Sequence, residues 1–225
     1  MNLPTAAPPR FVLPGRWGRI NLTSEATTIR SVRKVVEAAT GRRDDLASTR
    51  AELRARFQKA AAIAREGGAT DFYVAFQLTT TIQLPAWVSV FTPEVDSTDF
   101  AALGLDELRQ FIDTGTKEWG GEAGDAATTT TVDSDRLHAV RHSWRRRVEV
   151  EEGEVTKDFT FVEADYWIAA TNPNRIALLT FSTALAEHEE SMLELFDAIV
   201  TTLRWPAVDT PGGMVDSMKG DPSPA

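Results

Sequence analysis

Histidine side chains are the first candidates for metal or acid–base chemistry. The chain has three, His138, His142 and His188. The first two are four residues apart, a spacing that aligns two ligands on a helix but holds them roughly 13 Å apart in a strand. The surrounding pattern predicts a strand, so this pair is too far apart to share one metal ion. His188 precedes two glutamates without the second histidine of a zinc-protease helix. We therefore expect all three to be solvated surface residues.

A basic cluster follows the first two histidines and contains one tryptophan. In a strand, alternate side chains face opposite sides of the sheet, which separates two sets: Arg141, Arg145 and Arg147 on one side, Trp144 and Arg146 on the other. Cationic groups beside an aromatic platform are typical of single-stranded nucleic-acid surfaces. One tryptophan in an acidic protein is weak support for that function.

Two other roles suit the Arg141–Arg147 strand better. The favoured one is a ladder of cross-strand salt bridges with Glu149, Glu154 or Glu163. The other is a basic patch for an acidic protein partner. Trp119, in the glycine-rich stretch 114–125, is a further candidate: it is either an exposed anchor for a partner or a lid folded back on the core.

Pairs of carboxylates and known catalytic motifs give little evidence for an enzyme active site. Asp133 with Asp135, or Glu163 with Asp165, could be paired as the two acids of a glycosidase, but adjacent acids near strand ends are common in any acidic protein. No serine stands in a nucleophile elbow, and no glycine-rich phosphate loop is present. The sequence thus predicts no catalytic, cofactor-binding or metal-ligating residue.

Composition narrows the function further. The chain has 225 residues, a net charge of −9 and a pI near 4.9, so phosphate backbones would repel it, and we expect no nucleic-acid partner. It has no cysteine, which excludes disulfides, thiolate nucleophiles and cysteine-ligated metals. No apolar run is long enough to span a bilayer, and residues 1–14 do not resemble a secretory signal. We expect a cytoplasmic protein without membrane insertion. Its preference for arginine over lysine indicates a GC-rich, actinobacterial source.

Apolar periodicity predicts the elements of the first half. Residues 17–22 and 72–78 alternate as strands, and Pro85 and Pro93 flank a third strand at 86–91 that pairs with the second. Ser24 is placed to cap a helix that carries Ile29, Val32, Val35 and Val36 and ends at Thr40-Gly41. A longer helix covers 44–66 and ends at Gly67-Gly68.

The second half is predicted to contain five strands, preceded by a short helix and followed by a final helix. A short helix is expected at 105–112, a loop at 114–125, and strands at 128–132, 137–150 and 155–163. Two further strands, 165–170 and 175–181, flank a turn at 172–174. The final helix carries an apolar stripe, namely Met192, Leu195, Phe196, Ile199, Val200 and Leu203.

Short connections between consecutive strands favour antiparallel pairing. The predicted fold class is therefore α+β: an antiparallel β-sheet flanked by helices in an α/β/α sandwich, in a single domain. We expect this domain at 16–206, a proline-rich tail at 1–15 and a disordered tail at 207–225.

The C-terminal block resembles the PsbP-like α/β/α sandwich superfamily. The resemblance rests on Trp17, on the hairpin 166–181 and on the closing segment 195–205, which ends in Thr201-Thr202-Leu203-Arg204-Trp205. It implies an antiparallel sheet flanked by helices, and a binding, accessory or assembly protein. It carries over no catalytic residues.

Together these features predict a non-enzymatic accessory or adaptor protein that binds another protein through a sheet edge, the Trp119 loop or the Arg141–Arg147 strand. A bacterial secretion or cell-envelope system is compatible with that role. The alternative is a small-molecule-binding or weakly catalytic domain with a pocket between sheet and helices. Converging polar groups with shifted pKa values would favour the alternative.

Overall fold

The computed structural model describes residues 9–41, 44–93, 105–118, 127–134, 137–152, 155–169 and 176–205. Trp119, the turn at 172–174 and the expected tail at 207–225 lie outside these ranges. Within them, no helix has the length and apolarity needed to cross a membrane.

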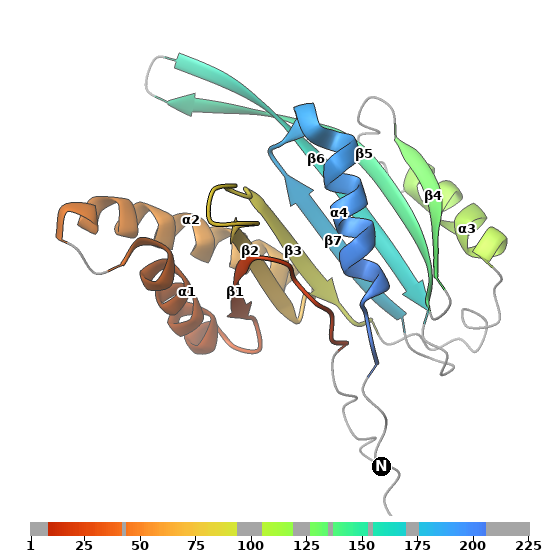
Figure 1. Cartoon of the computed structure of the whole chain (residues 1–225), viewed down its shortest axis with the longest axis horizontal. Coiled ribbons are helices and arrows are strands. Elements are labelled where there is room, and N and C mark those ends of the chain that lie inside the picture. Colours follow the sequence, from red (N-terminus) through yellow and green to blue (C-terminus); the bar gives the residue numbers. More distant parts are fainter. Residues whose placement is uncertain are drawn as a thin grey trace, which may run out of the picture.

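Seven antiparallel strands form one sheet, in the order β1-β2-β3-β7-β6-β5-β4 (Figure 1). The strands are β1 (Arg16–Asn21), β2 (Asp71–Gln77), β3 (Ala86–Phe91), β4 (Thr128–Ser134), β5 (Leu137–Glu152), β6 (Val155–Ala169) and β7 (Ile176–Thr183). The predicted pairing of β2 with β3 is confirmed, and β6 and β7 lie in the interior of the sheet.

Helices cover both faces of the sheet. They are α1 (Glu25–Thr40), α2 (Ala47–Glu66), α3 (Leu105–Glu118) and α4 (Glu189–Thr201). On one face, α1 and α2 pack over β1 and β2, and α3 packs over β4 and β5. On the opposite face α4 lies across the centre of the sheet (Figure 1). The α+β class, with a sheet between helical layers, is confirmed.

The first helix begins where the sequence predicts, but its buried face differs. The hydroxyl of Ser24 accepts a hydrogen bond from the Thr27 amide, and Gly41, with a φ of 72°, ends the helix. The prediction that Ile29 belongs to the buried stripe is wrong, because its side chain is 46% exposed. Thr28 is buried instead, and its hydroxyl donates to the Asn21 carbonyl. The hydrogen bond makes a polar residue tolerable there.

Two predicted boundaries are also wrong. The α3 helix continues past residue 112 to Glu118, through the stretch expected to be a loop. The strands expected at 155–163 and 165–170 are a single strand, β6, of 15 residues. Ala164 pairs with Ser143 in an uninterrupted register with β5, so the long neighbouring strand holds β6 continuous.

Residues 10–13 pack against the domain. Arg10 and Arg204 exchange backbone hydrogen bonds of 2.9 and 2.7 Å, and the Phe11 ring meets the Tyr73 ring edge-on at 5.4 Å. The packed fold therefore begins before residue 16.

The contact between α4 and the sheet forms the main core. The Phe196 ring stacks on Phe181 at 4.5 Å, and Tyr166 meets Phe181 edge-on. At the centre of this layer, Asp197 accepts hydrogen bonds of 2.6 Å from both the Arg141 guanidinium and the Tyr166 hydroxyl. Burial lowers the pKa of Arg141, but the charges of Asp197 and Tyr166 and the hydrogen bonds to both together outweigh it, so the pKa is raised. Asp197 thus fixes where α4 sits on β5 and β6.

We expect Asp197→Ala to lower the free energy of unfolding by about 2–4 kcal/mol, because it leaves a largely buried arginine and a buried hydroxyl without their acceptor. Urea unfolding followed by circular dichroism measures the loss. Glu194→Ala, on the exposed side of the same helix, is the control and should change stability by less than about 0.5 kcal/mol. Equal midpoints for the two variants would contradict this role of Asp197.

Candidate functional site

A row of polar residues crosses the centre of the sheet on the face that carries α1, α2 and α3. The strand register aligns five of them across five adjacent strands, one residue per strand: Ser89 (β3), Thr180 (β7), Asp165 (β6), His142 (β5) and Thr129 (β4). Because side chains alternate along a strand, all five project to the same face. We name these residues, together with Glu163, the polar row.

Glu163 stands two residues before Asp165 and therefore on the same face. Its side chain is only 5% exposed, beside Ser182, which is fully buried. The Arg146 guanidinium donates two hydrogen bonds, of 2.9 and 2.6 Å, to one carboxylate oxygen of Glu163. Arg146 also lies 5.2 Å from the centre of the Phe161 ring. This ion pair compensates a carboxylate that would otherwise be costly to bury.

Asp165 lacks such compensation. Its Oδ1 atom is buried and has no hydrogen-bond partner among the described residues. Burial raises the pKa of Asp165 to about 6, the Thr180 hydroxyl opposes this, and the nearby charge of Glu163 adds to it. Burial also raises the pKa of Glu163, with Arg146 acting against the shift. A carboxyl group that titrates near neutral pH can serve as a general acid or base, or can bind a cationic group.

His142 extends the polar row toward the sheet edge. Its Nδ1 atom lies 3.1 Å from the Thr129 hydroxyl, and its ring packs 5.4 Å from the Trp144 ring. His138 is confirmed in the same strand, four residues away.

Across the residues that the structure describes, no three histidine or acidic side chains are grouped to hold a metal ion. His188 directly precedes α4 and is exposed, as expected.

The Arg141–Arg147 strand is mostly engaged in ion pairs. Arg146 pairs with Glu163, one of the predicted partners. Arg141 and Arg145 instead cross to α4 and pair with Asp197 and Glu189, at 2.6 and 2.5 Å. The expected cross-strand ladder is thus correct for one arginine and wrong for these two. These ion pairs remove support for the strand as a basic patch for a partner, and Trp119 lies outside the described residues.

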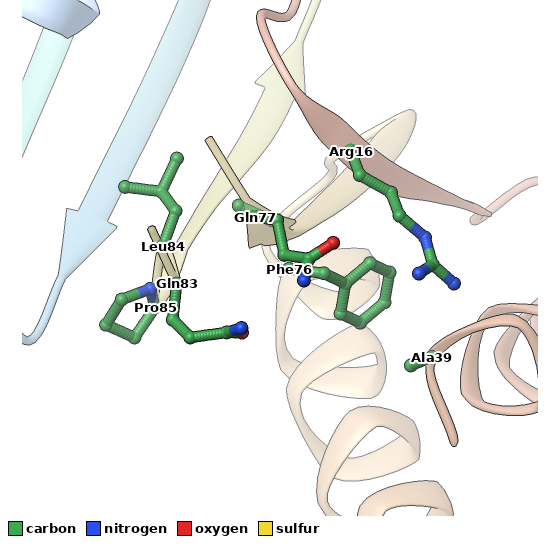
Figure 2. A pocket seen from close by; sticks show the side chains of 8 residues that line it. Arg16, Ala39, Phe76, Gln77, Gln83, Leu84 and Pro85 are labelled. Atoms are coloured by element: carbon green, nitrogen blue, oxygen red, sulfur yellow. The ribbon is translucent and has the colours of Figure 1, made fainter. Parts of the chain in front are cut away.

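Two shallow depressions lie on the surface, and neither includes a residue of the polar row. The first, of about 430 Å³, lies between the end of β2, the turn that follows it and the end of α1 (Figure 2). Arg16 lies over the Phe76 ring there and donates to the Ala38 carbonyl. The second, of about 410 Å³, lies at the start of α4 beside the Arg145–Glu189 pair. Neither shows the convergence of acid, base and hydroxyl groups that the polar row does.

The sequence contains a signal for part of the polar row, beyond the possible pairing of Glu163 with Asp165. Glu163 and Asp165 alternate with Val162, Ala164 and Tyr166, which are all fully buried. Acidic residues at alternate positions of so apolar a strand must lie on the face opposite α4. Whether that face is covered depends on the placement of other helices, which the pattern does not reveal.

No known protein family matches the chain, and no curated protein matches it. A solved structure from Bacteroides thetaiotaomicron is similar with a TM-score of 0.32 and 12% sequence identity. The match covers 60% of this chain and 39% of that one, so the chain spans well under half of its length. So distant a likeness carries no argument about function. The resemblance to the PsbP-like superfamily stays a prediction.

The pKa of Asp165 predicts an unusual pH dependence of stability. The folded protein holds this proton up to about pH 6, whereas an ordinary aspartate releases it near 3.8. Between these values the folded state binds more protons, so stability falls as the pH rises. We expect Asp165→Asn to be more stable than the wild type at pH 8, by up to about 3 kcal/mol, and the difference to vanish near pH 4.

Urea unfolding of both proteins at several pH values measures this difference. Asp158→Asn, which removes an exposed carboxylate from the same strand, should leave the shape of the pH profile unchanged. A constant difference between Asp165→Asn and wild type from pH 4 to 8 would show that the carboxyl does not titrate as stated.

Proposed function

We propose that the chain is a non-enzymatic accessory protein that binds another protein through a projecting β-hairpin. The hairpin consists of residues 144–152 of β5 and 155–161 of β6, and we name it the arm. β4 stops pairing with β5 at Ser143, and β7 stops pairing with β6 at Val162. Beyond these residues no other described strand pairs with β5 or β6, and the two strands, paired with each other, extend away from the body (Figure 1). This extension is the observation that carries the proposal.

One face of the arm carries a stripe of apolar side chains. Val148 lies opposite Phe159, and Arg146 opposite Phe161, so alternation places Phe159 and Phe161 on the same side. The Phe161 ring packs 5.6 Å from Trp87 of β3, whereas Phe159 is 41% exposed. An apolar stripe, Trp87–Phe161–Phe159 with Val148, therefore runs from the body onto the arm. We name it the aromatic stripe.

The aromatic stripe has the composition of the centre of a protein interface. Aromatic side chains with a few apolar neighbours supply most of the binding energy at such sites, and charged residues surround them as a rim. On the other face of the arm, Arg147 lies opposite Thr160 and Glu149 opposite Asp158. A partner that covers Phe159 with apolar side chains fits the aromatic stripe, and the exposed Arg146 guanidinium lies on the same face, at its rim. A setting in bacterial secretion or in the cell envelope stays a prediction, as does the absence of enzymatic activity.

We expect Phe159→Ala to abolish capture of a partner protein from a lysate of the source organism, because it removes the exposed aromatic group of the stripe. The measurement is affinity capture with the full chain, followed by mass spectrometry. Ile63→Ala is the matched control, since Ile63 is a large apolar residue on α2 that is 62% exposed. A partner captured equally well by both variants binds elsewhere, which would contradict the proposal.

A second candidate function, small-molecule binding or weak catalysis, is favoured by one observation. The buried Oδ1 atom of Asp165 lacks a hydrogen-bond partner, and the neighbouring hydroxyl and imidazole groups could orient a ligand. A thermal-shift panel of small amines and polyols tests it. A compound that stabilises the wild type but not Asp165→Asn supports this function. Equal shifts in both proteins would count against the polar row.

A further inference from the structure

The outer edge of the arm carries a charge pattern that is complementary to itself. From Arg145 to Glu152 the strand reads Arg-Arg-Arg-Val-Glu-Val-Glu-Glu, with the basic half before Val148 and the acidic half after it. β4 covers β5 only as far as Ser143, and no described strand pairs with the outer edge of β5 beyond that point. We propose that two copies of this chain associate by antiparallel pairing of these β5 edges about a two-fold axis at Val148.

The register follows from the charges. With Val148 opposite Val148 of the second copy, Arg147 lies opposite Glu149, and the position of Arg145 lies opposite that of Glu151. The two-fold axis repeats the Arg147–Glu149 pairing, so two Arg–Glu pairs form, while Arg145 stays bound to Glu189 of its own chain. A shift of two residues one way sets Arg147 against Arg147, and the other way sets Glu149 against Glu149. Shifts of one residue are excluded, because they would place side chains from opposite faces side by side.

A repulsion between two acidic side chains within one chain favours the same pairing. Glu149 lies directly opposite Asp158 of β6, and both side chains are exposed. Like charges in this position destabilise a strand pair. An arginine from a second copy on the free side of Glu149 would offset that repulsion. The Arg145–Glu189 and Arg146–Glu163 ion pairs hold the base of the arm to the body, which orients the edge before association.

This inference does not depend on the proposed function. Edge pairing uses the backbone of β5, whereas the aromatic stripe lies on a face of the arm. Joining two copies would place their aromatic stripes side by side, on the same surface of a four-stranded ribbon.

Exchanging the charges of Arg147 and Glu149 tests the proposed register between the two β5 edges. In sedimentation velocity over a concentration series, we expect the wild-type chain to dimerise. Arg147→Glu and Glu149→Arg should each raise the dissociation constant about tenfold or more, because each variant converts two attractive pairs into repulsive ones. The double variant R147E/E149R restores opposite charges at both pairs and should regain the wild-type constant. Added salt should weaken the wild-type dimer.

Because the chain has no cysteine, one introduced thiol gives an independent measurement. Val148→Cys would face its own copy across the axis at cross-strand distance, which is short enough for a disulfide. We expect a covalent dimer on mild oxidation, whereas the exposed control Ile63→Cys should stay monomeric. A wild-type chain that is monomeric at all concentrations, or a double variant no better than the single ones, would overturn the proposal.

Discussion

The fold depends on how α4 is held against the two central strands. The Phe181–Phe196 stack supplies apolar contact, and Asp197 adds direction by accepting hydrogen bonds from Arg141 and Tyr166. Apolar packing alone tolerates sliding and rotation, whereas a buried carboxylate with two donors fixes one position. Because β6 and β7 lie at the middle of the sheet, their position in turn determines where β3 and β5 pair.

The two faces of β6 differ in the side chains that they carry. Under α4, the side chains of Val162, Ala164, Tyr166 and Ile168 form a closed apolar layer. On the opposite face the same strand presents Glu163 and Asp165. The cost of placing these carboxylates there is only partly offset, by Arg146 for one and by a hydroxyl for the other. Of the two carboxylates, only Asp165 has a buried oxygen without a hydrogen-bond partner among the described residues, and this makes the polar row a candidate site.

Local chemistry made much of the fold predictable. Ser24 and Gly41 bound α1 through capping geometry, and the proline-flanked strand 86–91 matches β3 residue for residue. The errors arose where tertiary contacts override local pattern. Ile29 has the apolar character of a core residue, but Thr28 occupies the buried position because its hydroxyl finds a carbonyl acceptor on the preceding strand. The glycine at position 115 suggested a loop, yet α3 continues through it to Glu118.

The sequence by itself determined the period of each element, and hence which residues share a face. It also indicated the antiparallel class, because most of the connections between consecutive strands, from β2 to β3 and from β4 through β7, are short. Only the tertiary structure decided which faces are covered and which charges meet. Arg141 and Arg145 pair with acids 56 and 44 residues away on α4, although nearer glutamates were available along the strand. The reason is physical: alternation fixes the side to which a side chain points, but the element that lies on that side depends on the packing of the whole chain.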